Sequence, residues 1–219
     1  MDRTAPEPFT QDRRPEEPEG RVRLGVLVSG NGTNLQAILD ASTDPDFPAE
    51  VVVVVSDRPG AYALTRARRA GVGAYVVPRE AFSDRASFEE RITEILERHA
   101  VEVVCLAGFL RILSPVFVER FCGRILNIHP ALLPTFGGKG MYGERVHRAV
   151  LASGVTHSGC TVHFVTADVD AGPVILQATV PVLPDDTAAS LARRVAAQEH
   201  RIYPEAIRIV ARRVRAATT

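Results

Sequence analysis

Residues 51–56 read VVVVVS, a run of five valines closed by a serine. Valine is β-branched and favours extended backbone, and consecutive side chains of a strand point to opposite faces. A strand that is apolar on both faces must be covered on both faces, which is typical of the parallel sheets of α/β proteins. The run therefore predicts an α/β fold with a buried central sheet.

The sequence on either side repeats this alternation of buried strand and amphipathic helix. From apolar periodicity, strands are expected at residues 21–30, 74–77, 101–109 and 124–129, and helices at residues 33–41, 61–71, 84–99 and 114–121. For the helix at 84–99, the expected N-cap is Ser83 or Ser87. Ser87 has capping-box spacing to Glu90. This order predicts a doubly wound, mostly parallel sheet with helices on both faces.

The final third of the chain has a different character. Strands are expected at 161–165 and 173–182, separated by a tight acidic loop, and a long helix is expected over about 187–211. The sequence contains neither an internal repeat nor a linker to a second domain. We predict a single Rossmann-like α/β domain over residues 21–215 with an irregular C-terminal third.

Composition excludes several classes of partner. The 26 basic and 26 acidic residues cancel, which argues against a nucleic-acid or anionic-membrane surface and favours a small-molecule partner. Residues 1–20 hold four prolines and nine charged residues and lack the apolar segment of a secretory signal. A disordered leader and a cytoplasmic location are therefore expected.

The cysteines and histidines do not form a metal-binding pattern. Cys105, Cys122 and Cys160 are odd in number and far apart, so they are expected as buried free thiols rather than as disulfides or metal ligands. The six histidines include His157 and His163, which flank an expected strand, and His147 on a helix, without ligand spacing. No metal site is predicted.

The stretch SGNGTN (29–34) follows the first strand and opens a helix. It resembles a dinucleotide-binding turn, and Asp57 after the second strand would supply the acidic partner of a ribose. However, Leu35 stands where the third glycine belongs, so a nicotinamide cofactor is not expected. A glycine-rich turn at a helix N-terminus can still bind one phosphate through its backbone N–H groups. The alternative is a purely structural turn.

The stretch RILNIHPALLPT (124–135) places Asn127 and His129 two positions apart in an apolar strand. Residues at this spacing share a face, here at the carboxyl end of the strand, where open α/β sheets bind ligands. The loop ADVDAGP (167–173) adds Asp168 and Asp170. An amide, an imidazole and a carboxylate suit acyl transfer, although each alone could be structural. The turn after the strand also makes Leu133–Pro134 a candidate for a cis bond.

Several stretches together resemble the glycinamide ribonucleotide formyltransferases, which are folate-dependent enzymes of purine synthesis. They are SGNGTN, AGFLRILSP, NIHPALLP, GCTVHFV, DVDAGPVILQ and QEHRIYPEAI, and the resemblance covers about residues 22–210. It implies that Asn127, His129 and Asp170 are catalytic when an amine attacks the formyl carbon of 10-formyltetrahydrofolate. In that scheme Asn127 and a cationic His129 stabilise the oxyanion, and Asp170 keeps His129 charged.

The resemblance also implies binding residues, 10-formyltetrahydrofolate as co-substrate, and neither a metal nor a nicotinamide. For the ribonucleotide these are Gly32, Thr33 and Asn34 at the phosphate, with Glu199 on the same substrate. For the folate they are Arg85, Leu110, Arg111, Ile112, Leu113, Asn127, Thr166, Ala167, Asp168, Val169 and Asp170. Arg85 and Glu199 rest on the resemblance alone. A monomer or a homodimer is expected.

The chain departs from this family after the stretch NIHPALLP (127–134). The connection TFGGKGMYGERVH (135–147) is longer than in many relatives and rich in glycine. One hypothesis is that residues 136–143 close over the substrate and that Lys139 reaches a phosphate; the alternative is a plain surface loop.

Three other functions compete with formyl transfer to an amine. A formyltetrahydrofolate deformylase would use a similar catalytic set with water as acceptor, but it carries a regulatory domain for which the leader is too short. A methionyl-tRNA formyltransferase would need an added RNA-binding domain with a basic surface. A non-catalytic nucleotide-binding module would keep the phosphate loop and tolerate the loss of Asn127 and His129.

Overall fold

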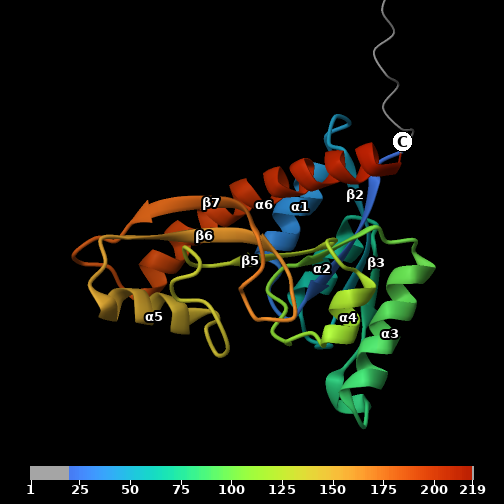
Figure 1. The fold of residues 1–219 in the computed structure, drawn as a ribbon, viewed down its shortest axis with the longest axis horizontal. Coiled ribbons are helices and arrows are strands. Elements are labelled where there is room, and N and C mark those ends of the chain that lie inside the picture. Colours follow the sequence, from blue (N-terminus) through green and yellow to red (C-terminus); the bar gives the residue numbers. More distant parts are fainter. Residues whose placement is uncertain (1–19, 219) are drawn as a thin grey trace, which may run out of the picture.

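The computed structural model of the chain describes residues 20–218, so the leader expected at 1–20 lies outside the described residues except for Gly20. Its core is one mixed sheet with the strand order β3-β2-β1-β4-β5-β6-β7 (Figure 1). The parallel strands are β1 (Val22–Val28), β2 (Ala49–Ser56), β3 (Gly73–Val76), β4 (Val103–Leu106) and β5 (Ile125–His129). The antiparallel strands are β6 (His157–Phe164) and β7 (Val174–Pro181). The predicted mostly parallel α/β sheet is confirmed.

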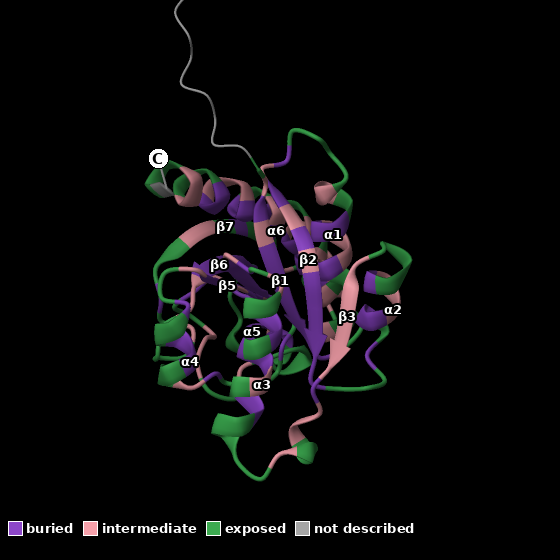
Figure 2. Cartoon of the chain, turned by 90° about the vertical axis from the view of Figure 1, so that its right-hand side faces the viewer, coloured by how far each residue is buried: buried purple, intermediate pink, exposed green. Residues whose placement is uncertain are grey.

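Helices cover the two faces of this sheet. One apolar cluster is built with α1 (Thr33–Ser42), α2 (Tyr62–Arg69), α5 (Glu144–Ser153) and α6 (Ala188–Thr218). The other is built with α3 (Arg85–Arg98) and α4 (Pro115–Arg120), and a short 3-10 turn, η1 (Arg79–Ala81), precedes α3. Strand residues alternate between the clusters: Val54 belongs to the first, and Val53 and Val55 to the second. The valine run is buried from both sides, as Figure 2 shows for β1 and β2.

Helix α6 is hydrogen-bonded to two neighbouring strands of the sheet, β4 and β5. Tyr203 is fully buried, and its hydroxyl lies 3.0 Å from the Leu106 carbonyl at the end of β4 and 3.2 Å from the Leu126 carbonyl in β5. Because Leu126 precedes Asn127, this tyrosine anchors the strand that carries the first expected catalytic residue. The helix continues to Thr218, beyond the predicted end at 211.

Some local predictions were wrong. The N-cap of α3 is Asp84, whose carboxylate accepts from the Ser87 N–H at 2.8 Å, rather than Ser83 or Ser87. Strand β4 is shorter than predicted, because the chain leaves the sheet at Ala107 and turns at Gly108, which has a φ of 72°. Cys105 and Cys160 are buried as expected, but Cys122 is exposed.

Two further observations bear on the expectations. The Leu133–Pro134 bond is cis, as proposed from its place after β5. Within residues 20–218, no helix combines the length and the apolar character needed to cross a membrane.

Candidate active site

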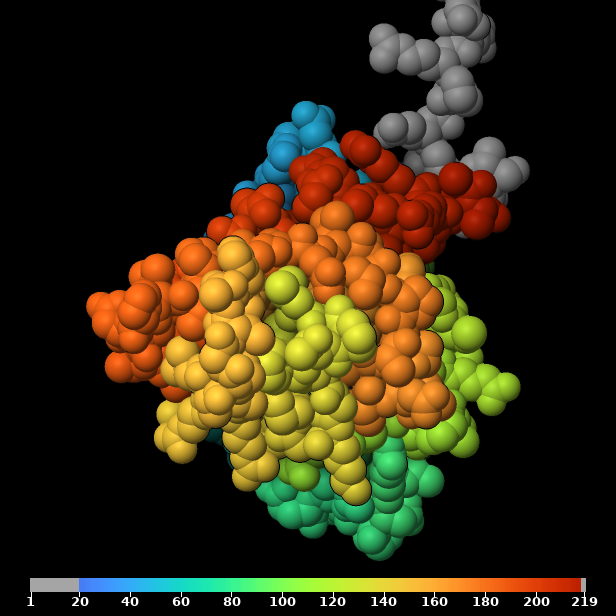
Figure 3. Space-filling view, turned by 60° about the vertical axis from the view of Figure 1, so that its left-hand side comes forward, coloured from blue at the N-terminus to red at the C-terminus, as the bar shows by residue number. Residues whose placement is uncertain are grey.

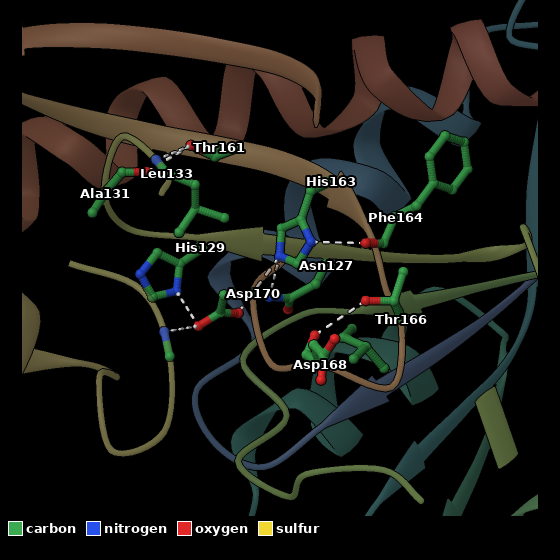
Figure 4. A network of polar contacts seen from close by, with 12 residues as sticks. Asn127, His129, Ala131, Leu133, Thr161, His163, Phe164, Thr166, Asp168 and Asp170 are labelled. Atoms are coloured by element: carbon green, nitrogen blue, oxygen red, sulfur yellow. Dashed lines mark hydrogen bonds and ion pairs between the residues drawn. The ribbon is translucent and has the colours of Figure 1, made fainter. Parts of the chain in front are cut away.

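The expected catalytic residues gather at the carboxyl end of β5 (Figure 4). Strand β6 pairs antiparallel with β5 and places His163 opposite Asn127. The loop between β6 and β7 then brings Asp170 between the imidazoles of His129 and His163, 3.5 Å from Nδ1 of His129 and 3.6 Å from Nε2 of His163. Asp170, and not Asp168, therefore faces the imidazoles.

The sequence DAGP explains how the chain returns so closely to β6. Asp170 has a φ of 55°, a conformation that Asp and Asn adopt more readily than most residues. At Gly172 an added Cβ would lie 1.8 Å from the Phe164 carbonyl oxygen, so no larger residue fits there. The glycine thus allows the loop to pack against β6 and deliver Asp170.

Charge in this cluster is set by burial and by close partners. Burial lowers the pKa of His129 and outweighs the Asp170 carboxylate and the Phe136 carbonyl, which both act to raise it. For Asp170, burial acts to raise the pKa, but the nearby His163 imidazole, the charge of His129 and the Gly138 N–H hold it below its usual value. Asp170 is therefore an anion at neutral pH. It favours a charged His129 as predicted, but the net direction for His129 is the reverse.

His163 is a site residue that the sequence reasoning missed. Its Nδ1 lies 2.9 Å from the Phe164 carbonyl, and its Nε2 lies 3.1 Å from the Asn127 amide nitrogen. A carbonyl can only accept, so Nδ1 carries a hydrogen, which leaves Nε2 to accept from the Asn127 amide. This contact orients the Asn127 amide. The strand motif alone carries no signal for it, because the pairing register with β5 is needed.

Two loops after β5 and β6 cover the His129–Asp170 pair. His129 Nε2 lies 2.9 Å from the Phe136 carbonyl, and the Gly138 N–H donates to Asp170 Oδ2 at 2.9 Å. In the space-filling view the segment after β5, in yellow, meets the β6–β7 loop, in orange (Figure 3). The glycine-rich connection is thus anchored on the site through residues 136–138, and Lys139 follows directly with an exposed side chain.

The expected phosphate loop lies at the start of α1. Gly32 is the N-cap with a φ of 74°, and a Cβ there would lie 2.6 Å from that of Ala63, so glycine is required. The Asn34 amide donates to Glu199 of α6 at 2.9 Å, so the structure brings these two expected ribonucleotide residues together. Burial raises the pKa of Glu199.

A cavity of about 430 Å³ adjoins this turn. Its lining residues are Thr33, Gln36, Ala37, Asp40, Arg66 and His200. Arg66 also donates to the Asn31 carbonyl at 2.8 Å, which holds the glycine-rich turn in place. The cavity therefore combines the backbone N–H groups at the start of α1, the Thr33 hydroxyl and the Arg66 guanidinium, which suit an anionic group, with the Asp40 carboxylate in the same lining.

The loop after β4 carries the expected folate residues. Its backbone is fixed by Leu110 N–H donating to Ser29 Oγ at 2.9 Å and by Arg85 donating to the Ile112 carbonyl at 2.5 Å. Arg85 also pairs with Glu89, which accepts from the Ser114 N–H at 2.8 Å and from the Ser114 hydroxyl. Arg85 therefore helps to hold the loop after β4 in place, through the Ile112 carbonyl and through Glu89.

Arg111 of this loop has a buried partner. It donates to Asp57 at 2.7 Å, and the Asp57 side chain is fully buried at the end of β2. The sequence suggested a ribose as the partner of Asp57, but in the structure its partner is Arg111.

Several apolar side chains are exposed beside the site and offer a surface to a flat ring. Leu110 and Ile112 are 44% and 47% exposed, and Val169 of the β6–β7 loop is 36% exposed, whereas Leu113 is buried. Thr166 donates to the Asp168 carbonyl at 3.2 Å, which keeps the second loop compact around Ala167. Within residues 20–218, no group of three or more His, Cys, Asp or Glu side chains is arranged to hold a metal ion.

Comparison with known proteins agrees with this geometry. The sequence pattern of the formyl transferase family matches residues 22–207. The phosphoribosylglycinamide formyltransferase of Escherichia coli (strain K12) is 45% identical over 183 residues, which are 84% of this chain and 84% of the relative. The crystal structure of glycinamide ribonucleotide transformylase 1 from Symbiobacterium toebii superposes with a TM-score of 0.83 at 53% identity, covering 87% of this chain and 88% of that one.

Longer relatives contain a similar segment. The trifunctional purine biosynthetic protein adenosine-3 of Bos taurus is 46% identical over 191 residues, and the chain spans only 18% of its length. The similarity is therefore to one part of that protein. The family match over most of the chain, together with relatives of similar length, shows that the chain belongs to the formyl transferase family, alongside the phosphoribosylglycinamide formyltransferases.

Proposed function

We propose that the chain transfers the formyl group of 10-formyltetrahydrofolate to the amine of N1-(5-phosphoribosyl)glycinamide, a step of purine synthesis. The observation that carries this proposal is the buried cluster of Asn127, His129, His163 and Asp170 at the carboxyl end of β5. It combines an amide donor with an imidazole and an anionic carboxylate, in a chain of the formyl transferase family.

The cluster supplies the groups that the reaction needs. The amine nitrogen bonds to the formyl carbon, and the formyl oxygen gains negative charge, which the Asn127 N–H stabilises by donating a hydrogen bond. The His129–Asp170 pair takes up the proton released by the amine and returns it to the departing folate nitrogen. When the carbon–nitrogen bond to the folate breaks, the proton count balances without a further reactant.

Binding of the two substrates is assigned to opposite sides of this cluster. Gly32, Thr33 and Asn34 present the N-terminus of α1 to the phosphate, and Glu199 contacts the same substrate. The folate ring lies against Leu110, Arg111, Ile112 and Leu113 on one loop and against the other loop. That second loop contributes Thr166, Ala167, Asp168, Val169 and Asp170. Arg85 supports the first loop, and Asn127 lies between the two substrates.

The proposal extends to the domain and its setting. Residues 21–215 form the catalytic domain, which works in the cytoplasm on small molecules, without nucleic acid, membrane, metal or nicotinamide, as a monomer or a homodimer. Support comes from the balanced charge of the chain and from its similarity to a relative of comparable length.

The test follows release of deformylated folate by absorbance, with and without the ribonucleotide. Product that forms only with the ribonucleotide supports transfer to the amine. Product without it identifies water as the acceptor and a deformylase. Absence of product in both cases favours a binding module, for which Asn127→Ala and His129→Ala would leave ligand affinity unchanged.

A further inference from the structure

The segment Phe136–Gly138 contacts both members of the His129–Asp170 pair through its backbone. The Phe136 carbonyl lies 2.9 Å from His129 Nε2, and the Gly138 N–H donates to Asp170 Oδ2 at 2.9 Å. Both contacts are shielded, because the His129 and Asp170 side chains are only 4% and 11% exposed. Two backbone groups of one short segment therefore hold the two side chains that face each other.

The local sequence is required for this arrangement. Phe136 has a φ of 57° and Gly138 a φ of 96°, both in the left-handed half of conformational space. At Gly137 an added Cβ would lie 2.5 Å from Leu133 Cδ2 and 3.3 Å from Asp170 Cβ. A non-glycine residue with positive φ, next to a glycine without room for a side chain, persists only where the surroundings fix the backbone.

The contacts decide which nitrogen of His129 exchanges its proton. A carbonyl oxygen accepts but cannot donate, so Nε2 carries a hydrogen whether the ring is neutral or charged. The other nitrogen, Nδ1, faces the Asp170 carboxylate at 3.5 Å. The hydrogen that is gained and lost must then be the one on Nδ1.

We propose that the Phe136 carbonyl and the Gly138 N–H are positioning groups that confine the exchanging proton of His129 to Nδ1, on the side of Asp170. This inference rests on the proposed roles of His129 and Asp170 in formyl transfer. It assigns to the glycine-rich connection a task distinct from covering the substrate.

Three ionisable neighbours face His129 from the elements packed around it. They are Asp170 from the β6–β7 loop, His163 from β6 and His147 from α5. His147 is buried, and its Nδ1 has no hydrogen-bond partner among the described residues. The two imidazoles oppose a positive charge on His129, whereas the carboxylate favours it. Because these effects compete, the position of the hydrogen is measured directly on the His129 ring.

The first experiment measures the tautomer of His129 in the full-length protein. Proton–nitrogen NMR spectra of ¹⁵N-labelled protein are recorded above the pH at which His129 titrates, and His129→Gln identifies its signals. The proposal expects the neutral ring to carry hydrogen on Nε2. Hydrogen on Nδ1 in the neutral ring would overturn it. This measurement needs neither substrate nor turnover.

The second experiment compares Gly138→Ala with Gly140→Ala. Both glycines have positive φ, 96° and 89°, and neither has an atom within 4 Å of an added Cβ, so the backbone cost is matched. Only Gly138 donates to Asp170. Displacing that amide should lower kcat by about tenfold or more and move the pH profile, whereas Gly140→Ala should change kcat by less than about threefold.

Equal losses in the two variants, with unshifted pH profiles, would overturn the positioning role. Failure of the proposed function is recognised separately: the wild-type protein would then form deformylated folate without the ribonucleotide, or form none in either case, whatever the tautomer of His129. If Gly138→Ala does not fold, the wild-type tautomer still decides the question.

Discussion

Asp170 is the residue on which the other members of the cluster converge, since it faces His129 and His163 and accepts from the Gly138 N–H. Asp170→Asn keeps the shape of the side chain but removes its charge. We expect normal folding and a loss of kcat of about 100-fold or more, because the proton carrier loses its partner. The check is kcat across the pH range, with exposed Asp185→Asn as control. Near-wild-type turnover at every pH would contradict the assignment.

His163 orients the Asn127 amide, and the resulting prediction concerns that contact. His163→Ala removes the acceptor for the Asn127 N–H, so the amide can rotate away from the developing oxyanion. A decrease in kcat of about 10- to 100-fold is expected, with a smaller change in KM. His157→Gln, at the exposed start of the same strand, is the matched control and should leave kcat within about twofold. Similar kcat values for both variants would refute the role of His163.

Some residues of the candidate active site could be predicted from the sequence, and others could not. Asn127 and His129 could be predicted because two strand positions share a face, and Asp170 because a compact acidic loop follows the next strand. His163 could not, because its neighbours depend on the antiparallel register of β6 against β5, which a single sequence does not specify.

Among the elements, the loop after β4 is fixed at several points, and the buried Asp57–Arg111 pair ties it to β2. Asp57→Asn removes the charge that holds Arg111. Because a buried partner is lost, the loop should shift and KM for the formyl folate should rise by about three- to tenfold, with kcat less affected. Steady-state kinetics with Asp44→Asn as a surface control measure this. An unchanged KM in a folded Asp57→Asn protein would show that the other contacts suffice.

The glycine-rich connection yields a second prediction at this scale. Residues 136–138 are anchored on the site, so Lys139 leaves it from a fixed point with its side chain exposed. If Lys139 reaches the phosphate, Lys139→Ala should raise KM for the ribonucleotide by about three- to tenfold and leave kcat nearly unchanged. Arg148→Ala, on the exposed surface of α5, serves as control. An unchanged KM would make this part of the connection a plain surface loop.

Element types were easier to predict than their ends. Apolar periodicity gave every parallel strand, but β4 ends early because the chain turns after Leu106, where the Leu110 N–H donates to Ser29 Oγ and the Arg111 side chain pairs with Asp57. Similarly, α6 runs past its predicted end, since Arg215 pairs with Glu102, which lies just before β4. Both effects are tertiary contacts that local pattern does not contain.

For the molecule as a whole, the valine run was sufficient to predict a sheet covered on both faces, and the apolar clusters confirm it. The C-terminal third differs from the rest of the fold because its two strands are antiparallel, and the apolar pattern of the sequence did not specify this. Strands β6 and β7 form an antiparallel pair against β5, and β7 is the outer strand, with alternating exposed and buried residues near its end. This extension brings His163 and Asp170 to the site.

The buried histidines make the stability of the whole molecule depend on pH. Burial lowers the pKa of His129, His147 and His200, so below about pH 6.5 the unfolded chain binds protons that the folded protein does not. Glu199, whose pKa burial raises, acts in the opposite direction at its own titration. Because three imidazoles oppose one carboxyl group, the free energy of unfolding should fall from pH 7 to pH 5. Urea unfolding of His147→Gln should show a smaller fall, whereas exposed His157→Gln should match the wild type; equal pH dependence in all three proteins would exclude His147 as a cause.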